Sequence, residues 1–237
     1  MAADHAAPSD RHVVLYHWPH SRSAGVRMLL EELGADYELR LLDLQAGAQR
    51  DPAYLAVNPM GKVPALKHGT ALVTEQVAVY LYLADLYPEA GLAPPIGDAL
   101  RGPYLRWMAF YGSSFEPAML DRAMKREAPP QSMSPYGDVE TVLKVIFEQL
   151  SRGPYIVGER YTAADVLWGG ALGWMTAFKM VEASPAVQAY IDRVMGKPGV
   201  VRAREKDQAL LAAAKSTALR SAAGEPAGSP DDGGSGH

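Results

Sequence analysis

Hydrophobic positions in residues 12–41 alternate between strand-like and helix-like spacing. Residues 12–17 form a short β-branched and aromatic run, which is typical of a buried strand. In residues 23–33 the apolar side chains recur at i, i+3, i+4 and i+7, and they are Val26, Leu29, Leu30 and Leu33. Gly34 then stands where a glycine ends a helix. Residues 37–41 alternate apolar and charged side chains, so the pattern predicts a strand–helix–strand unit with a right-handed crossover.

A hairpin and a second helix follow this unit. Residues 63–67 and 71–74 are strand-like and flank a turn at residues 68–70. Helical spacing then continues until Pro88, carried by Val77, Tyr80, Leu81 and Ala84. The order is β-α-β, an irregular or helical connection, and then β-β-α. This order predicts a thioredoxin-like α/β domain over residues 12–87.

The rest of the chain shows helical patterns alone. Residues 88–98 are rich in proline and glycine, which is typical of a linker. Residues 99–215 predict an all-α domain, with helices at 102–125, 138–151, 162–182, 185–195 and 200–215. Residues 1–11 and 216–237 are mostly small and polar, so we expect both tails to be disordered.

Composition narrows the possible chemistry. The 237 residues include 23 Lys and Arg and 27 Asp and Glu, and the net charge of −4 gives no electrostatic case for nucleic acid or an anionic membrane. The absence of cysteine excludes a disulfide, a cysteine-ligated metal and a protein thiol nucleophile. The six histidines form no HxxxH or HExxH pair, so no metal site is predicted. With no long apolar segment and no secretory signal, we expect a cytoplasmic protein.

Pro64 lies where the third strand is expected to begin, within the run NPMGKVPAL at residues 58–66. Proline cannot donate a hydrogen bond to a sheet, so its position there needs a reason. One solution is a cis Val63–Pro64 bond, which turns the chain and leaves the Val63 backbone groups pointing outward. The other is an ordinary trans proline at a sheet edge, which the frequencies of the two isomers favour when these residues are considered alone.

Three motifs in this order resemble the glutathione transferase superfamily over residues 12–212. They are LYHWPHSRSAGVRMLLEELG near the start, NPMGKVPAL followed by Glu75-Gln76, and GERYTAAD at residues 158–165. In the last motif, Thr162 and Asp165 have the spacing of a helix-opening capping box. The SRS run followed by LLEELG is similar to a bacterial and fungal branch. Arg22 and Glu116 stand where a cysteine-type class has its cysteine and a histidine, which argues against that class.

The resemblance implies a glutathione site with roles for particular residues. Val63 would pair its backbone with the cysteinyl part of glutathione, and Pro64 would be the cis proline that exposes that backbone. Glu75 would receive the γ-glutamyl ammonium. Gln76, where the family usually has Ser or Thr, would help a helix N-terminus to bind the γ-glutamyl carboxylate. Lys62 would meet the glycyl carboxylate. Taken singly, Glu75 is also an ordinary first-turn carboxylate and Lys62 an ordinary surface charge.

The thiol of glutathione resembles a free cysteine with a pKa of about 8.5, so it must be activated to react near neutral pH. By the resemblance, Ser21 aligns with the serine of serine-type classes and is the first candidate to stabilise the thiolate. Tyr16 aligns with the tyrosine of tyrosine-type classes and is the alternative, although it is equally a core aromatic. Ser23 is expected to be the N-cap of the first helix.

An electrophile pocket is expected between the two domains. Aromatic side chains crowd two of the predicted helices, and Tyr111 and Phe115 are the preferred pocket residues because they are i, i+4 neighbours. Aromatic residues at helical spacing are more often part of a core. A pocket of this composition suits small apolar electrophiles and names none of them.

The resemblance implies a glutathione S-transferase that conjugates the glutathione thiolate to small hydrophobic electrophiles in detoxification. It also implies a homodimer. A non-catalytic protein that binds glutathione or another ligand, with a regulatory role, is one alternative. A glutathione-dependent reductase or lyase that uses no protein thiol is the other.

Overall fold

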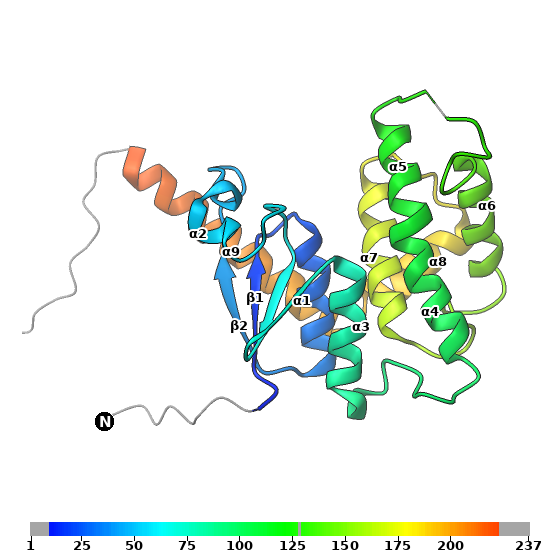
Figure 1. Ribbon diagram of the computed structural model, residues 1–237, viewed down its shortest axis with the longest axis horizontal. Coiled ribbons are helices and arrows are strands. Elements are labelled where there is room, and N and C mark those ends of the chain that lie inside the picture. The colour runs from blue at the N-terminus through cyan, green and yellow to red at the C-terminus, as the bar shows by residue number, and fades with distance from the viewer. Residues whose placement is uncertain (1–9, 128, 223–237) are drawn as a thin grey trace, which may run out of the picture.

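The computed structural model describes residues 10–127 and 129–222, with side chains of the last helix described as far as residue 216. The α/β domain and the helical domain lie side by side (Figure 1). Most of the predicted disordered tails, residues 1–9 and 223–237, falls outside the described residues. The fold is therefore the expected pairing of a thioredoxin-like domain with an all-α domain.

A four-stranded sheet forms the centre of the first domain, in the order β2-β1-β3-β4. The strands are β1 Val13–His17, β2 Tyr37–Leu41, β3 Ala65–His68 and β4 Ala71–Thr74. β1 runs parallel to β2 and antiparallel to β3, and β3 pairs antiparallel with β4. The predicted hairpin is confirmed, and Gly69 at its turn has a φ of 56°.

The helices α1 (Arg22–Leu33) and α3 (Gln76–Leu86) lie together on one side of the sheet (Figure 1). β1 alternates buried and half-buried residues, and its buried members include Leu15 and His17. The end of α1 follows the prediction, because Gly34 adopts the left-handed conformation there with a φ of 63°. The short α2 (Pro52–Leu55) precedes the Val63–Pro64 turn.

The second domain consists of helices within the described part of the chain. They are α4 Arg101–Phe110, α5 Glu116–Ala123, α6 Val139–Leu150, α7 Ala163–Ala177, α8 Pro185–Met195 and α9 Pro198–Ala222. The long helix predicted over residues 102–125 is interrupted by a π-helical turn at Tyr111–Phe115. The reason is Pro117 in the first turn of α5, which has no N–H to continue an α-helical ladder.

The predicted capping box opens α7 and is confirmed. Asp165 is fully buried, and its carboxylate accepts hydrogen bonds from the Thr162 N–H at 2.8 Å and the Ile156 N–H at 2.7 Å. It also accepts from the hydroxyls of Thr162 at 3.0 Å and Tyr190 at 3.1 Å. Burial raises the pKa of Asp165 to about 6, against the opposing effect of these hydrogen bonds.

The helix α9 leaves the helical domain and runs back along α1 (Figure 1). It continues to Ala222, past residue 215, where the pattern predicted its end. Gly199 permits the close approach, because a Cβ at this position would lie 2.6 Å from the Glu32 backbone nitrogen. The Glu32 carboxylate in turn accepts from the N–H groups of Gly199 at 2.6 Å and Val200 at 3.2 Å.

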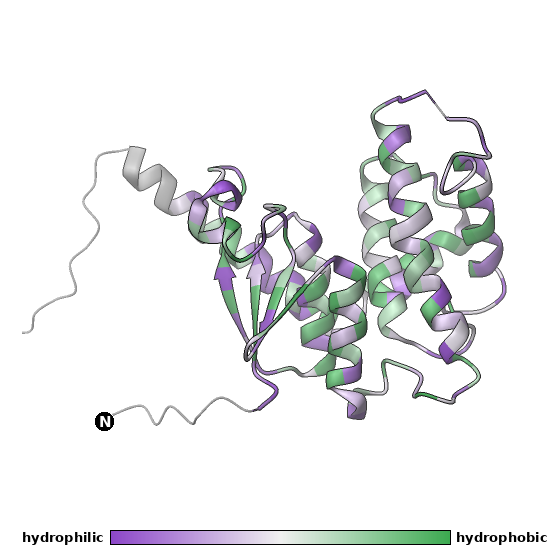
Figure 2. Ribbon diagram, viewed as in Figure 1, coloured by the Kyte–Doolittle hydropathy of each residue, from purple (hydrophilic) through white to green (hydrophobic). Residues whose placement is uncertain are grey.

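One hydrophobic cluster runs through both domains, from Leu15 in the sheet to Trp168 in α7. Figure 2 shows hydrophobic residues concentrated along α3, which lies between the sheet and the helical domain. The two domains therefore share a core. The starts of α1 and α3 contact the helical domain, through Arg22–Glu116 and Gln76–Tyr111.

Candidate active site

The turn before β3 contains a cis bond between Val63 and Pro64, the isomer that the residues alone did not favour and the family resemblance implied. The turn is held by the Lys62 carbonyl, which accepts from the Asn58 amide at 2.8 Å and from the Tyr54 hydroxyl at 2.5 Å. The backbone N–H and C=O of Val63 have no hydrogen-bond partner among the described residues. This backbone can therefore pair with an added extended peptide.

Glu75 sits at the N-cap of α3 in a conformation that is rare for a residue with a side chain. Its φ is 64° and its ψ is 118°. The side chain is exposed and forms no ion pair or hydrogen bond within the part of the chain that the structure describes. A backbone outlier of this kind is found most often at functional sites. It presents a free carboxylate beside the first N–H groups of α3.

Gln76 connects the starts of α3 and α1. Its amide nitrogen donates to the Arg22 carbonyl at 3.2 Å, so the two helix N-termini lie next to each other. Unpaired N–H groups and the helix dipole make such ends favourable for anions. Lys62 is exposed on the neighbouring turn, and its side chain has no partner among the described residues.

Ser21, and not Ser23, is the N-cap of α1, which corrects the expectation from the sequence. The Ser21 Oγ accepts from the Ser23 N–H at 3.1 Å and donates to the Trp18 carbonyl at 2.7 Å, and it also lies 2.7 Å from the Ser23 Oγ. The two positions have the same side chain, so the sequence could not separate them. Ser23 is fully buried, and its hydroxyl is hydrogen-bonded to His17. Ser21 is only half-buried.

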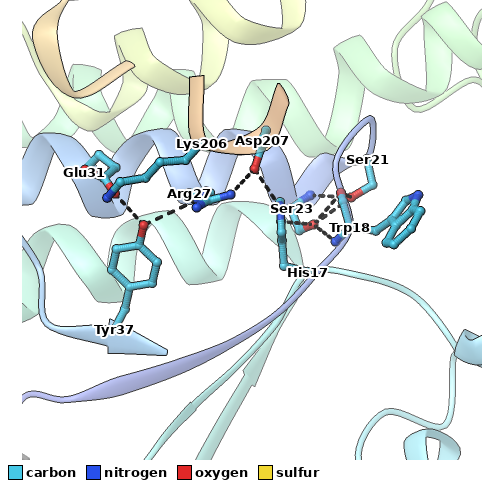
Figure 3. A network of polar contacts seen from close by, with 9 residues as sticks. All are labelled: His17, Trp18, Ser21, Ser23, Arg27, Glu31, Tyr37, Lys206 and Asp207. Carbon is cyan, nitrogen blue, oxygen red and sulfur yellow. Dashed lines mark hydrogen bonds and ion pairs between the residues drawn. The ribbon is translucent and has the colours of Figure 1, made fainter. Parts of the chain in front are cut away.

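A line of polar groups leads inward from Ser21 (Figure 3). The Ser23 Oγ lies 2.9 Å from His17 Nδ1, and His17 Nε2 lies 3.0 Å from Asp207 Oδ1 on α9. Asp207 also forms an ion pair with Arg27 on α1. Of these residues, Ser23 was predicted only as a helix cap, and His17, Arg27 and Asp207 were not predicted. The available signal was His17, a polar side chain on the buried face of β1 with Val13 and Leu15.

Tyr16, the alternative activator, points to the other side of β1. Its ring lies 5.3 Å from that of Tyr54 in α2, and the Lys67 ammonium lies 6.0 Å from its centre. Strand alternation places it opposite His17, which faces Ser23. The structure thus places Ser21 at the start of α1. It places Tyr16 beside Tyr54, whose hydroxyl holds the Val63–Pro64 turn.

Arg22 and Glu116 form an ion pair at 2.6 Å and link the two domains. The Tyr111 hydroxyl donates to the same Glu116 carboxylate at 3.1 Å. Burial and the nearby Glu116 raise the pKa of Tyr111 well above its usual range, so this hydroxyl remains a donor. The ion pair lies where the starts of α1 and α3 meet the π-helical turn.

Tyr111 and Phe115, the residues preferred for an electrophile pocket, are both buried. Their rings lie 5.3 Å and 4.8 Å from the ring of Trp168, in an aromatic cluster of the helical domain. Only the hydroxyl of Tyr111 reaches toward Gln76, at 3.5 Å. Phe115 is therefore part of the core of the helical domain in this conformation, and the contact of either residue with an electrophile stays a prediction.

The arrangement can hold an extended, charged peptide next to a hydroxyl. The Val63 backbone offers strand pairing, Glu75 offers an anion for an ammonium, and the two helix ends offer sites for carboxylates. Ser21 adds a hydroxyl at the start of α1. No group of three or more His, Asp or Glu residues among those described could hold a metal ion. Nor is any described helix long and apolar enough to cross a membrane.

The family models for the N-terminal and C-terminal domains of glutathione S-transferase match residues 12–85 and 115–198. Glutathione S-transferase GstA of Escherichia coli O157:H7 is 30% identical over 192 residues, which is 78% of this chain and 94% of that protein. The disulfide-bond oxidoreductase YfcG of Escherichia coli K12 is 28% identical over 208 residues, covering 82% and 95%.

Two solved structures show the same fold. A glutathione transferase from Methylococcus capsulatus has 32% identity and a TM-score of 0.69, covering 83% of this chain and 98% of its own. A sphingomonad glutathione S-transferase complexed with glutathione has 29% identity and a TM-score of 0.66, covering 82% and 98%.

Proposed function

The chain belongs to the glutathione S-transferase family. We propose that it binds glutathione between the Val63–Pro64 turn and the starts of α1 and α3. We further propose that it conjugates the glutathione thiolate to small apolar electrophiles. The observation that carries the proposal is that three features lie together, because Ala65 of β3 pairs with Thr74 of β4 and the Gln76 amide donates to the Arg22 carbonyl at 3.2 Å. The three features are the unpaired Val63 backbone, the strained and unpartnered Glu75, and the Ser21 cap of α1.

Each part of glutathione has a matching group in this arrangement. The cysteinyl backbone pairs with Val63, the γ-glutamyl ammonium meets Glu75, and the γ-glutamyl carboxylate meets Gln76 and the start of α3. Lys62 is the cation available for the glycyl carboxylate. The sphingomonad structure, which is 29% identical and complexed with glutathione, supports glutathione binding by a protein of this fold.

Ser21 stabilises the thiolate in the proposed reaction. Its O–H and the start of α1 lower the pKa of the bound thiol, and the thiolate then attacks an electrophilic carbon by substitution or addition. A thioether forms, and a leaving group departs where the reaction is a substitution. Tyr111 and Phe115 are the proposed floor of the electrophile site. We also propose a cytoplasmic homodimer with a role in detoxification.

A thiol-disulfide reaction is the second candidate, and the similarity to the oxidoreductase YfcG favours it. The absence of cysteine means that any such reaction would take both electrons from two glutathione molecules. The products separate the candidates, because conjugation consumes glutathione into a thioether and reduction yields glutathione disulfide. Binding without either product would indicate the non-catalytic alternative.

Substitution of Ser21 and Tyr16 tests the assignment of the activator. We expect Ser21→Ala to abolish the ultraviolet thiolate band of bound glutathione near neutral pH, and to lower the rate with an aryl halide by about 100-fold or more. Tyr16→Phe is expected to retain most of both signals. The opposite result would transfer the role to Tyr16.

A further inference from the structure

A continuous line of hydrogen-bonding groups joins the surface at Ser21 to the C-terminal helix (Figure 3). It passes from Ser21 Oγ to Ser23 Oγ at 2.7 Å, then to His17 Nδ1 at 2.9 Å, and from His17 Nε2 to Asp207 Oδ1 at 3.0 Å. His17 and Ser23 are fully buried and Asp207 is 8% exposed. The line therefore reaches solvent and substrate through Ser21.

The chemistry of the end groups fixes the direction of these hydrogen bonds. A carboxylate accepts only, so Asp207 requires a hydrogen on His17 Nε2. In neutral histidine this leaves Nδ1 as an acceptor, and it must receive the Ser23 hydroxyl. The Ser21 hydroxyl donates to the Trp18 carbonyl at 2.7 Å and has the Ser23 oxygen as a second acceptor at the same distance, so a proton passes to Ser23 when the Ser21 O–H rotates from Trp18 to Ser23. The Trp18 N–H, 3.1 Å away, also donates to Ser23 and holds its oxygen in place.

We propose that this line is a proton relay in which His17 receives the thiol proton of bound glutathione and Asp207, on α9, positions and charge-stabilises His17. The inference rests on the proposed function, because it requires the thiol to lie against Ser21. His17 and Asp207 act through the two serines and do not touch the substrate, so they are positioning residues.

The proton movement balances along the line. The thiol passes its proton to the Ser21 oxygen, Ser21 passes its own to Ser23, and Ser23 passes its own to His17 Nδ1. The sulfur becomes a thiolate and His17 becomes an imidazolium, while both serines remain neutral. After the transfer the Ser21 O–H points toward the sulfur, which is the direction needed to stabilise a thiolate. Asp207 then faces an imidazolium through Nε2–H.

Charged groups on two elements face the relay. Arg27 on α1 shares the Asp207 carboxylate with His17, and its Nε lies 3.5 Å from the Tyr37 hydroxyl. Farther along α1, the Glu31 carboxylate accepts from Tyr37 and forms ion pairs with Arg202 and Lys206 of α9. The Glu31 pairs join the same two helices without touching His17, so they provide a matched control for the docking of α9.

The test compares Asp207→Asn and His17→Gln with the control Lys206→Gln, which breaks a neighbouring α1–α9 ion pair. The thiolate band of bound glutathione is titrated with pH in each protein. Affinity for S-methylglutathione, which has no thiol proton, checks that the site is intact. We expect the thiolate midpoint to rise by about one unit or more in Asp207→Asn and His17→Gln, and to stay at the wild-type value in Lys206→Gln.

A second measurement needs only the wild-type protein. Calorimetry in buffers of different ionisation enthalpy counts the protons released when glutathione binds, with S-methylglutathione as the reference. If His17 keeps the thiol proton, the two ligands release the same number. Release of about one extra proton for each thiolate formed would overturn the relay, whatever the variants do.

The outcomes separate the relay from the proposed function. No binding of glutathione to wild-type protein would contradict the function itself. A thiolate band that depends on Ser21 but titrates unchanged in Asp207→Asn and His17→Gln would overturn the relay and leave the function standing. An equal shift in Lys206→Gln would also overturn it, because the cause would then be the docking of α9.

Discussion

Glu75 combines a strained backbone with a free carboxylate. A non-glycine residue that adopts a φ of 64° destabilises the fold by about 1–3 kcal/mol. No ion pair or hydrogen bond with another described side chain offsets this strain at Glu75. This is the expected arrangement when a residue is held for a ligand and not for the fold.

Glu75→Gln removes the charge and keeps the shape, and we expect it to weaken glutathione binding by about tenfold to a hundredfold. The reason is the loss of a charge-assisted hydrogen bond to the ammonium, worth about 1.5–3 kcal/mol. Calorimetric titration measures the change. The matched control is Glu38→Gln, an exposed carboxylate on β2 that is paired with Arg40. Equal affinity in wild type and Glu75→Gln would remove Glu75 from the site.

At the residue scale, the sequence motifs located the turn and the start of α3 but did not determine how the serines are used. Resemblance implied the cis bond before Pro64, whereas local frequency favoured the other isomer. Ser21 and Ser23 are equivalent by local pattern, and only the burial of Ser23 against His17 separates their roles. The partner of His17 is Asp207. No rule of local sequence spacing connects two residues that are so far apart in the chain.

Gly199 decides how closely α9 approaches α1. A Cβ there would lie 2.6 Å from the Glu32 nitrogen and 2.7 Å from the Glu31 carbonyl carbon, both backbone atoms that cannot move alone. We expect Gly199→Ala to lower the free energy of unfolding by about 1–3 kcal/mol. In Gly102→Ala on α4, where nothing lies within 4 Å, helix propensity should instead add up to about 1 kcal/mol. Denaturant unfolding of both variants measures the signs, and a gain in Gly199→Ala would contradict the packing.

The buried cap of α7 should give stability an unusual pH dependence. Asp165 has a pKa raised from 3.8 to about 6 by burial, so the folded state holds its proton more tightly than the unfolded chain. The contribution of this group to the free energy of unfolding therefore falls as pH rises from 3.8 to about 6, by on the order of 3 kcal/mol.

Urea unfolding across this pH range, in wild type and Asp165→Asn, measures that contribution as the difference between the two proteins. The exposed cap of α6, Asp138, is the opposite case, because the hydrogen bonds from Thr141 lower its pKa. The wild-type advantage over Asp138→Asn should therefore grow with pH. The wild-type advantage over Asp165→Asn should fall as pH rises. If it grew with pH instead, the folded state would favour the charged carboxylate of Asp165, and the prediction would be wrong.

At the element scale, hydrophobic spacing was sufficient to predict the strands, the hairpin and most helices within a few residues. It failed where the backbone ladder, and not the side-chain pattern, sets the geometry. The apolar periodicity continues through Tyr111–Phe115, yet Pro117 removes a donor and the chain forms a π-helical turn. The continuation of α9 to Ala222 likewise could not be predicted, because the last residues of this helix carry no hydrophobic periodicity.

At the scale of the whole molecule, the candidate site is completed by both domains. The α/β domain carries the proposed residues Val63, Glu75 and Ser21, while the helical part pairs Glu116 with Arg22 and Asp207 with His17. The shared core keeps these parts in one arrangement. The order of elements predicted the two domains, but the return of α9 to α1 depends on tertiary packing between the two ends of the chain.

The most direct test of the account is the ultraviolet difference spectrum of wild-type protein titrated with glutathione near neutral pH, followed by addition of an aryl halide. We expect a saturable thiolate band, which then disappears as a thioether product forms. No saturable binding at millimolar glutathione would contradict the central claim that the Val63–Pro64 turn, Glu75 and Ser21 form a glutathione site.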